Sequence, residues 1–332
     1  MAWKTSPNGQ YNYKRYLVLE RTVHILSKLK TTLQVVLVSG AFVANAGAQT
    51  ITVFACEPEW AALTRVLLPN ANVHVATHAK QDPHHIEARP ALIAQLRSAD
   101  VAVCTGGELE SAWLPMLQQR AGNSKVQNGA QGMFFASEQV EMIDPRPGVV
   151  GTPFSGDVHA EGNPHFHTDP HRFLKVALAL SKRFASLFPQ EASAINQRTQ
   201  AFSQMWSQQV QQWEKRAASL KGMRVASQHT TFAYLWRWLG IEQISDLEPK
   251  PGMAPTPAHL QRQLSLLQTT PVEAVVVAAY QDPRAAKWLT SQAGIQAPLL
   301  VLPATTDNPL AADALVTWYE QLVTSLVKVR AK

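Results

Sequence analysis

The amino-acid sequence predicts an α/β protein of two lobes, each with a mostly parallel sheet flanked by helices, joined by a single long connector helix. Apolar runs that look like buried strands alternate with helical patterns in both halves of the chain. A long segment with helical periodicity and without Gly or Pro separates the halves. The chain has 332 residues, of which 46% are hydrophobic, enough to fill more than one core of ordinary domain size.

The first 48 residues have the order of a secretory signal peptide. Basic and polar residues come first, the apolar run 33–43 follows, and small residues occupy 44–48. We expect cleavage after Ala48 and a periplasmic mature protein. The apolar run is too short to span a bilayer, and a buried helix of a cytosolic protein is the alternative.

The basic character of the chain belongs to this leader. Residues 1–48 hold six of the 30 Lys and Arg residues and one of the 24 acids, so without them the formal net charge falls from +6 to +1. A nucleic-acid partner would need a basic surface on the folded domain, and we expect none. The two cysteines, Cys56 and Cys104, are too few for a disulfide scaffold or a Cys-x-x-Cys zinc site.

The N-terminal α/β lobe is predicted to span residues 49–188. Its candidate strands are 51–55, 73–76 and 101–104, and helical patterns lie at 60–68 and 90–98. Strands that alternate with helices indicate a parallel sheet covered on both faces. The segment 122–157, rich in Gly, Pro and polar residues, is predicted to be an irregular loop.

The connector helix is predicted at residues 189–221, and the C-terminal α/β lobe at 222–332. Pro189 starts the connector and Gly222 ends it. Its apolar residues recur every three or four positions, as expected of one buried helix face: Phe202, Trp206, Val210, Trp213, Ala217 and Leu220. At 1.5 Å per residue the helix would be roughly 45 Å long, enough to run beside both lobes. The candidate strands of the second lobe are 224–227, 274–279 and 299–302.

Three segments place a histidine near a predicted strand end. They are Gln-Asp-Pro-His-His at 81–85, Gly-Asn-Pro-His-Phe-His at 162–167 and Ser-Gln-His-Thr-Thr-Phe at 227–232. In open α/β sheets ligands bind beyond the carboxyl ends of the strands. Proline before a histidine restricts the backbone, and neutral imidazole is a strong ligand for zinc and later first-row metals. Taken alone, each histidine is better explained as an ordinary surface or satisfied core residue, and a His-Glu-x-x-His motif is absent.

Five segments, in their order along the chain, resemble the zinc/manganese family of metal-binding solute-binding proteins of ABC importers. They are Cys-Glu-Pro-Glu-Trp at 56–60, 81–85, Gly-Glu-Leu-Glu at 107–110, 162–165 and Ala-Tyr-Gln-Asp-Pro at 279–283. The resemblance runs from around Ile51 to the C-terminus. It implies two α/β lobes joined by one long helix, with a metal ion in the cleft between them.

The resemblance also implies the ligands. Matched to the family's motifs, His84, His165 and His229 supply three nitrogens, and Asp307, in a late loop, supplies a carboxylate. Relatives that select manganese tend to have a carboxylate where His229 stands, which favours Zn²⁺, with Mn²⁺ as the alternative. The chain lacks the long His- and Asp-rich loop of some zinc members.

His167 stands where the family often has an aromatic residue, and it is the rival of His165. If this segment is extended, the two side chains share a face. His171 follows Asp169-Pro170, which reads as a helix N-cap and first residue, a position that disfavours a cation. The remaining candidates are interpreted as surface residues: His74, His78, His159 and His259.

These features predict a monomeric, extracytoplasmic protein that captures a divalent transition metal and delivers it to the permease of an ABC importer, without being an enzyme. A manganese-specific member of the family and a periplasmic metallochaperone are the alternatives. A secreted zinc hydrolase would need a general base beside the metal, and the candidates Glu57 and Glu87 lie in no recognisable catalytic motif.

Cys56 and Cys104 follow strands that are neighbours in a sheet whose strand order begins 2-1-3. A disulfide and a pair of buried thiols are both compatible with this placement, because bridging requires the Cα atoms to lie within roughly 7 Å.

Overall fold

The structure is a computed structural model that describes residues 50–146, 157, 159–292 and 294–331. The predicted signal peptide, residues 1–48, lies outside the described residues, as does part of the predicted loop 122–157. Residues 49–332 form one unit by their contacts. No helix among the residues that the structure describes is long and apolar enough to cross a membrane.

The sheet of the first lobe has four parallel strands in the order β2-β1-β3-β4. The strands are β1 (Thr52–Ala55), β2 (Asn72–Val75), β3 (Val101–Cys104) and β4 (Met133–Phe135). The helices of this lobe are α1 (Pro58–Leu67), α2 (Pro90–Ser98) and α3 (Leu114–Ala121), with short 3₁₀ turns at Ser124–Val126 and Ala136–Gln139. Strands β1, β2 and β3 confirm the prediction, whereas β4 lies within the stretch predicted to be an irregular loop.

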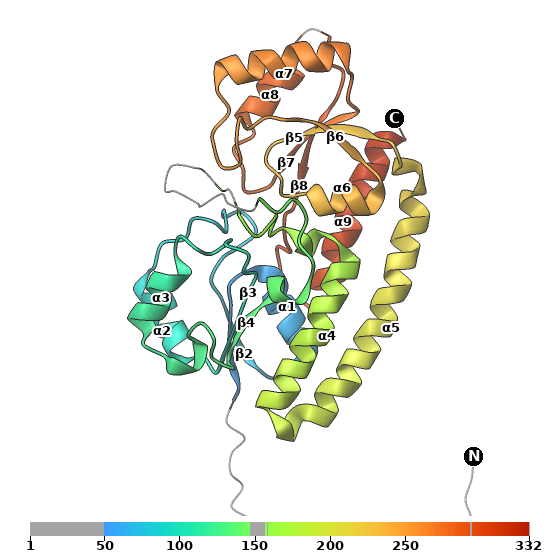
Figure 1. Ribbon diagram of the computed structural model, residues 1–332. Helices are drawn as coiled ribbons and strands as arrows, with labels where there is room; N and C mark the ends of the chain where they lie inside the picture. The colour runs from blue at the N-terminus through green and yellow to red at the C-terminus, as the bar shows by residue number, and fades with distance from the viewer. Residues whose placement is uncertain (1–49, 147–156, 158, 293, 332) are drawn as a thin grey trace, which may run out of the picture. The chain divides into compact units, whose positions relative to one another are not determined.

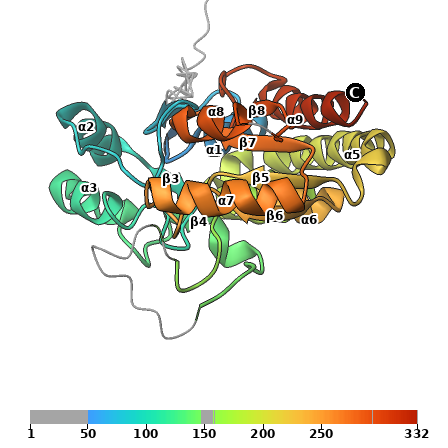
Figure 2. The ribbon, with the colours of Figure 1, turned by 90° about the horizontal axis from the view of Figure 1, so that it is seen from above.

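Successive side chains of β1 and β3 point to opposite faces of the first sheet, and both faces are apolar. Val53 and Val101 join the core cluster that contains α1, whereas Phe54 and Ala102 face the cluster of α2 and α3. Figure 2 shows α2 and α3 on one side of this sheet and α5 and α9 on the other. The parallel sheet is therefore covered on both faces, as all-parallel sheets require.

The second lobe repeats this plan with the parallel order β6-β5-β7-β8. The strands are β5 (Arg224–Ser227), β6 (Glu242–Asp246), β7 (Ala274–Ala278) and β8 (Leu299–Leu302). The helices are α6 (Ala233–Leu239), α7 (Pro257–Thr269), α8 (Arg284–Thr290) and α9 (Ala314–Arg330). Val275 and Val277 face α7 and α8, while Val276 faces the cluster that also contains α9. Two α/β lobes are thus present, as predicted.

One long helix joins the lobes. Helix α4 (Pro170–Leu187) precedes it, a 3₁₀ turn at Pro189–Glu191 leads into α5 (Ala192–Ala217), and a second turn at Ala218–Leu220 ends it. Figure 1 shows α5 beside both lobes, packed on α4. Every residue of the predicted apolar stripe is buried: Phe202, Trp206, Val210, Trp213, Ala217 and Leu220. The predicted connector is confirmed.

The core does not stop at the boundary between the lobes. A single cluster of buried apolar side chains includes Val53 of the first sheet, Trp206 of α5 and Val276 of the second sheet. Polar contacts add to it, since the Tyr234 hydroxyl of α6 donates to Asn163 O at 2.7 Å and accepts from Ile143 N at 2.9 Å.

A disulfide joins Cys56 to Cys104, which decides between the two alternatives left by the sequence. Both cysteines lie at the carboxyl ends of paired strands, and their Cα atoms are 4.8 Å apart. The bond closes a loop with a sequence separation of 48 residues.

We expect that replacing both cysteines by alanine lowers the free energy of unfolding by about 2–4 kcal/mol, because the bond restricts the unfolded chain. Urea unfolding of the metal-free protein measures this loss. The single variant Cys104→Ala is the matched control and should lose nearly as much, since either substitution breaks the bond. Recovery of two free thiols from the denatured, unreduced wild type would contradict the disulfide.

Candidate metal centre

Three buried histidines from three separate segments converge between the lobes. His84 lies in the loop after β2, His165 immediately precedes a 3₁₀ turn at Phe166–Thr168, and His229 follows β5. They are only 3%, 1% and 3% exposed, respectively. The centroid of the His84 ring lies 5.4 Å from that of His165 and 5.5 Å from that of His229. The ring centroids of His165 and His229 are 5.4 Å apart. The structure therefore brings together three of the four residues predicted as ligands.

The Asp-Pro-His segment orients His84. Asp82 Oδ1 accepts a hydrogen bond from the backbone N of His84 at 3.0 Å and pairs with its Nδ1 at 2.7 Å. An aspartate that bonds the backbone two residues further on makes a compact turn, and Pro83 between them restricts it further. The opposite ring nitrogen, Nε2, is buried and has no hydrogen-bond partner among the described residues.

The Asn-Pro-His segment orients His165 by the same kind of turn. Asn163 Oδ1 accepts from the backbone N of His165 at 2.9 Å, and Asn163 Nδ2 donates to Thr230 O of the second lobe at 3.0 Å. Burial, and then the nearby His229 and His84, lower the pKa of His165 well below its ordinary value. His165 is therefore a neutral imidazole, the form that binds metals.

His229 is held by two acids of the second lobe. Its backbone N donates to Asp246 Oδ1 at 3.1 Å, and its Nδ1 lies 2.9 Å from Glu248 Oε2. Its φ of 63° is in the left-handed region, which a side-chain-bearing residue adopts at a cost of about 1–3 kcal/mol where the surroundings enforce it. Burial lowers the pKa of His229, but the Glu248 hydrogen bond and the charges of Glu248, Asp157 and Asp246 outweigh burial and raise it.

The three rings leave Nε2 atoms for a common ligand. The Nε2 atoms of His165 and His229 are 3.3 Å apart. Two nitrogens bound to one tetrahedral zinc at 2.0–2.1 Å would be separated by roughly 3.3 Å. One ligand nitrogen from each of the three histidines fits within a group whose members all lie within 4.8 Å of one another. Carboxylates on the Nδ1 atoms of His84 and His229 are the usual outer partners of metal-bound histidine.

Asp307, the fourth predicted ligand, does not join this group. Thr305 Oγ1 donates to Glu59 Oε2 at 2.6 Å and Thr306 is buried, but the chain then turns outward and Asp307 is exposed. Asp307 lines a surface groove with Asn308 and Asp313 instead. The family resemblance pointed to this loop, whereas in the structure the loop contacts the first lobe through the buried Thr305.

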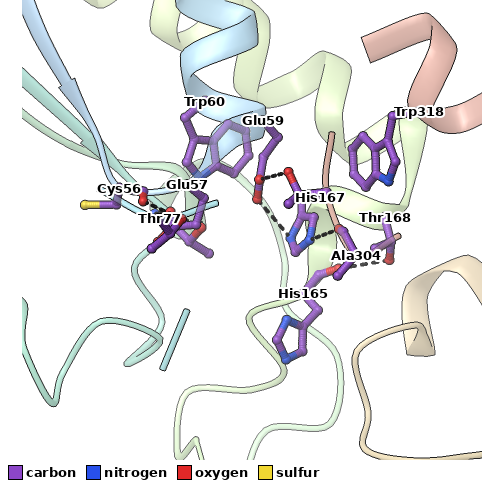
Figure 3. Close-up of polar contacts among 12 residues, drawn as sticks. Cys56, Glu57, Glu59, Trp60, Thr77, His165, His167, Thr168, Ala304 and Trp318 are labelled. Carbon is purple, nitrogen blue, oxygen red and sulfur yellow. Dashed lines mark hydrogen bonds and ion pairs between the residues drawn. The ribbon is translucent and has the colours of Figure 1, made fainter. Parts of the chain in front are cut away.

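His167 is not placed as an alternative to His165. The segment Phe166–Thr168 is a 3₁₀ turn rather than an extended strand, so the two side chains do not share a face. The His167 Nε2 lies 3.1 Å from Ala304 O, its Nδ1 lies 3.6 Å from Glu59 Oε1, and its ring stacks on Trp318. Figure 3 shows His167 between Glu59 and Ala304, with His165 projecting away from them.

His159 was interpreted as a surface residue, and this is wrong. Its ring stacks on His84 with centroids 5.4 Å apart, and its Nε2 is buried without a partner among the described residues. Burial, then the nearby His84 and His229, lower the pKa of His159 to about 3. The half-exposed His171 lies at the start of α4, where Asp169 caps the helix as predicted, and its Nε2 pairs with Glu214 at 2.8 Å.

Neither candidate base of a hydrolase joins the three histidines. Glu57 is 3% exposed and accepts a hydrogen bond from Thr105 Oγ1 at 2.9 Å. Burial and the neighbouring carboxylates raise the pKa of Glu57 well above its ordinary value. Glu87 is exposed. The described site is thus suited to hold an ion in a closed, buried position.

Comparison with known proteins agrees with this reading of the fold. The model of the family ZnuA, zinc-uptake complex component A, periplasmic, matches residues 53–329. The high-affinity zinc uptake system protein ZnuA of Yersinia pestis is 22% identical over 231 residues, which cover 67% of this chain and 69% of that protein.

Solved structures share the two-lobe fold at low sequence identity. A crystal structure of ZnuA aligns with a TM-score of 0.70 and 18% identity, covering 85% of this chain and 99% of that one. The solute-binding protein FpvC of Pseudomonas aeruginosa, solved in complex with Mn²⁺, aligns with a TM-score of 0.70 and 17% identity, covering 85% and 98%. These likenesses show the architecture alone.

Proposed function

Because the chain belongs to the ZnuA family of periplasmic zinc-uptake components, we propose that it captures Zn²⁺ in the periplasm and delivers it to the permease of an ABC importer. In this proposal residues 1–48 are a cleaved signal peptide. Residues 49–188 and 222–332 are the two lobes of a monomer, and 189–221 connect them. His84, His165 and His229 hold the ion.

One observation carries the proposal: three buried imidazoles present nitrogens to one point, and two of them are fixed by carboxylates on their opposite nitrogens. Burying three rings at this spacing is unfavourable for the metal-free protein unless their protons are removed or shared. A bound cation satisfies all three lone pairs. Three nitrogen donors suit tetrahedral zinc better than manganese, which favours oxygen ligands and higher coordination.

Elemental analysis of the mature protein, purified from the periplasm without added metal, tests the proposal. We expect close to one zinc per chain in the wild type and none in a variant with alanine at His84, His165 and His229. Stoichiometric manganese instead would identify a manganese-selective member. Absence of metal from the wild type, both as isolated and after incubation with Zn²⁺ or Mn²⁺, would contradict the function.

Transport separates an importer component from a periplasmic metallochaperone. A deletion strain should require more zinc for growth, and the wild-type gene should restore uptake only when the cognate permease is present. Restored zinc delivery without a permease would favour the chaperone.

A further inference from the structure

The three histidines leave one position of a tetrahedral ion without a protein ligand, and Asp307 is not near it. Two other acids beside the histidines are already engaged. Asp82 holds the Nδ1 of His84, and Glu248 holds the Nδ1 of His229. A carboxylate that orients a metal-bound histidine is an outer partner rather than a ligand.

Asp246 accepts from the backbone N of His229, and Asp157 is a further acid beside these residues. Its side chain is 12% exposed, its Oδ2 lies 4.0 Å from His84 Nδ1, and its Oδ1 lies 3.5 Å from His85 Nε2. Asp157, Asp82 and His84 form a second group whose ligand atoms lie within 4.8 Å of one another. The negative charge of Asp157 also contributes to the raised pKa of His229, a ligand from the second lobe.

The second lobe fixes Asp157 in this position. The backbone N of Asp157 donates to Pro251 O at 2.9 Å. Gly252 has a φ of +75°, and a Cβ at this position would meet the Asp157 Oδ2 at 2.4 Å, so only glycine accommodates the carboxylate. Gly252 N in turn donates to Glu248 Oε2, the atom that pairs with His229 Nδ1. One short segment therefore positions both His229 and Asp157.

We propose that Asp157 supplies the fourth, carboxylate ligand of the ion held by His84, His165 and His229, an inference that rests on the function proposed above. Its Oδ2 approaches His84 at Nδ1 rather than at the ligand atom Nε2, so the carboxylate must rotate toward the ion. The contacts that it would leave, at 3.5 and 4.0 Å, are longer than hydrogen bonds. A carboxylate oxygen together with three histidine nitrogens is a ligand set that zinc accepts. The ion would then bind two residues of the first lobe besides Asp157, and His229 of the second.

Competition with a chromophoric chelator measures Zn²⁺ affinity in the wild type, Asp157→Asn and the matched control Asp307→Asn. We expect Asp157→Asn to weaken binding on the order of 10- to 100-fold, at least the loss typical of an outer partner, because a neutral amide replaces the negatively charged carboxylate. Asp307→Asn should keep wild-type affinity. The visible spectrum of the Co²⁺-loaded protein should change in Asp157→Asn and not in the control, which reports on the ligand set independently of affinity.

Wild-type affinity and an unchanged Co²⁺ spectrum in Asp157→Asn would overturn the inference, as would a loss found in Asp307→Asn instead. His159→Gln tests the nearest unpartnered imidazole, and if it alone alters the Co²⁺ spectrum, the fourth ligand is nitrogen and the inference is wrong. Melting of the metal-free variants checks that each one folds. Failure of the proposed function is distinct, because the wild type itself would then bind neither Zn²⁺ nor Co²⁺.

Discussion

Alanine at His84, His165 or His229 is expected to weaken zinc binding by roughly 60- to 700-fold. Zinc bound by four protein ligands in small peptides has an apparent binding free energy of about 10–16 kcal/mol, which is roughly 2.5–4 kcal/mol for each ligand. Every 1.4 kcal/mol corresponds to about tenfold in the dissociation constant. Each of the three residues is buried and held by a neighbouring side chain, so its loss leaves a gap in the ligand set.

Competition titration of the three variants measures this loss. His171→Ala is the matched control, because His171 is exposed and pairs with Glu214 away from the three rings. Asp307→Ala should have a much smaller effect, since Asp307 is exposed and outside the group. Loss of zinc in His167→Ala together with retention in His165→Ala would show that the other histidine of the pair is the ligand.

Zinc at a thousandfold excess over its dissociation constant should stabilise the fold by about 4 kcal/mol. For a folded unit of this size we expect a rise in melting temperature of roughly 10 °C. The rise should shrink on acidification. His229, whose pKa is raised, must lose a proton before it binds the ion, whereas His165, whose pKa is lowered by burial, is already neutral.

In the metal-free protein, the contribution of His229 to stability changes with pH in the opposite direction to the stabilisation by zinc. A histidine whose pKa is raised by folding stabilises the fold fully below its unfolded pKa of about 6.5, and this contribution is lost as the pH rises through the folded pKa. The zinc-induced shift should therefore be larger at about pH 8 than at about pH 5.5. Differential scanning calorimetry with and without zinc measures it, with Mg²⁺ as the control ion. Equal shifts at both pH values would argue against imidazole ligands.

Local sequence signals predicted the parts of the fold that local forces determine. The apolar stripe of α5 and the buried runs of β1, β3 and β7 repeat over enough residues to identify a helix or a strand. Strand β4 has only three residues, too few for a periodic signal, and it is a strand because it pairs with β3. Strand β6 was missed for a similar reason: its sequence Glu-Gln-Ile-Ser-Asp is polar, and it lies at the sheet edge.

The residues of the site also divide into those that local sequence signals predicted and one that they did not. The Asp-Pro-His and Asn-Pro-His turns are local, so the sequence could place His84 and His165 in ordered loops, and the family resemblance brought them together with His229. Asp157 was not predicted, because its place depends on contacts with Pro251 and Gly252, more than ninety residues away. Alternation in Asp157-Val158-His159, just before the Asn-Pro-His turn, was the one signal that could have drawn attention to it.

The continuous apolar core between the lobes limits how an ion can leave. In a binding protein whose lobes meet only through flexible strands, rotation about the hinge opens the cleft at little cost. Here such a rotation would expose side chains of a shared cluster, at about 25 cal/mol for each Å² of apolar surface. We therefore expect release to proceed by displacement of the loop that carries His84, while the lobes keep their orientation. The surface of that loop is marked by His85, which is exposed and lies 3.5 Å from Asp157.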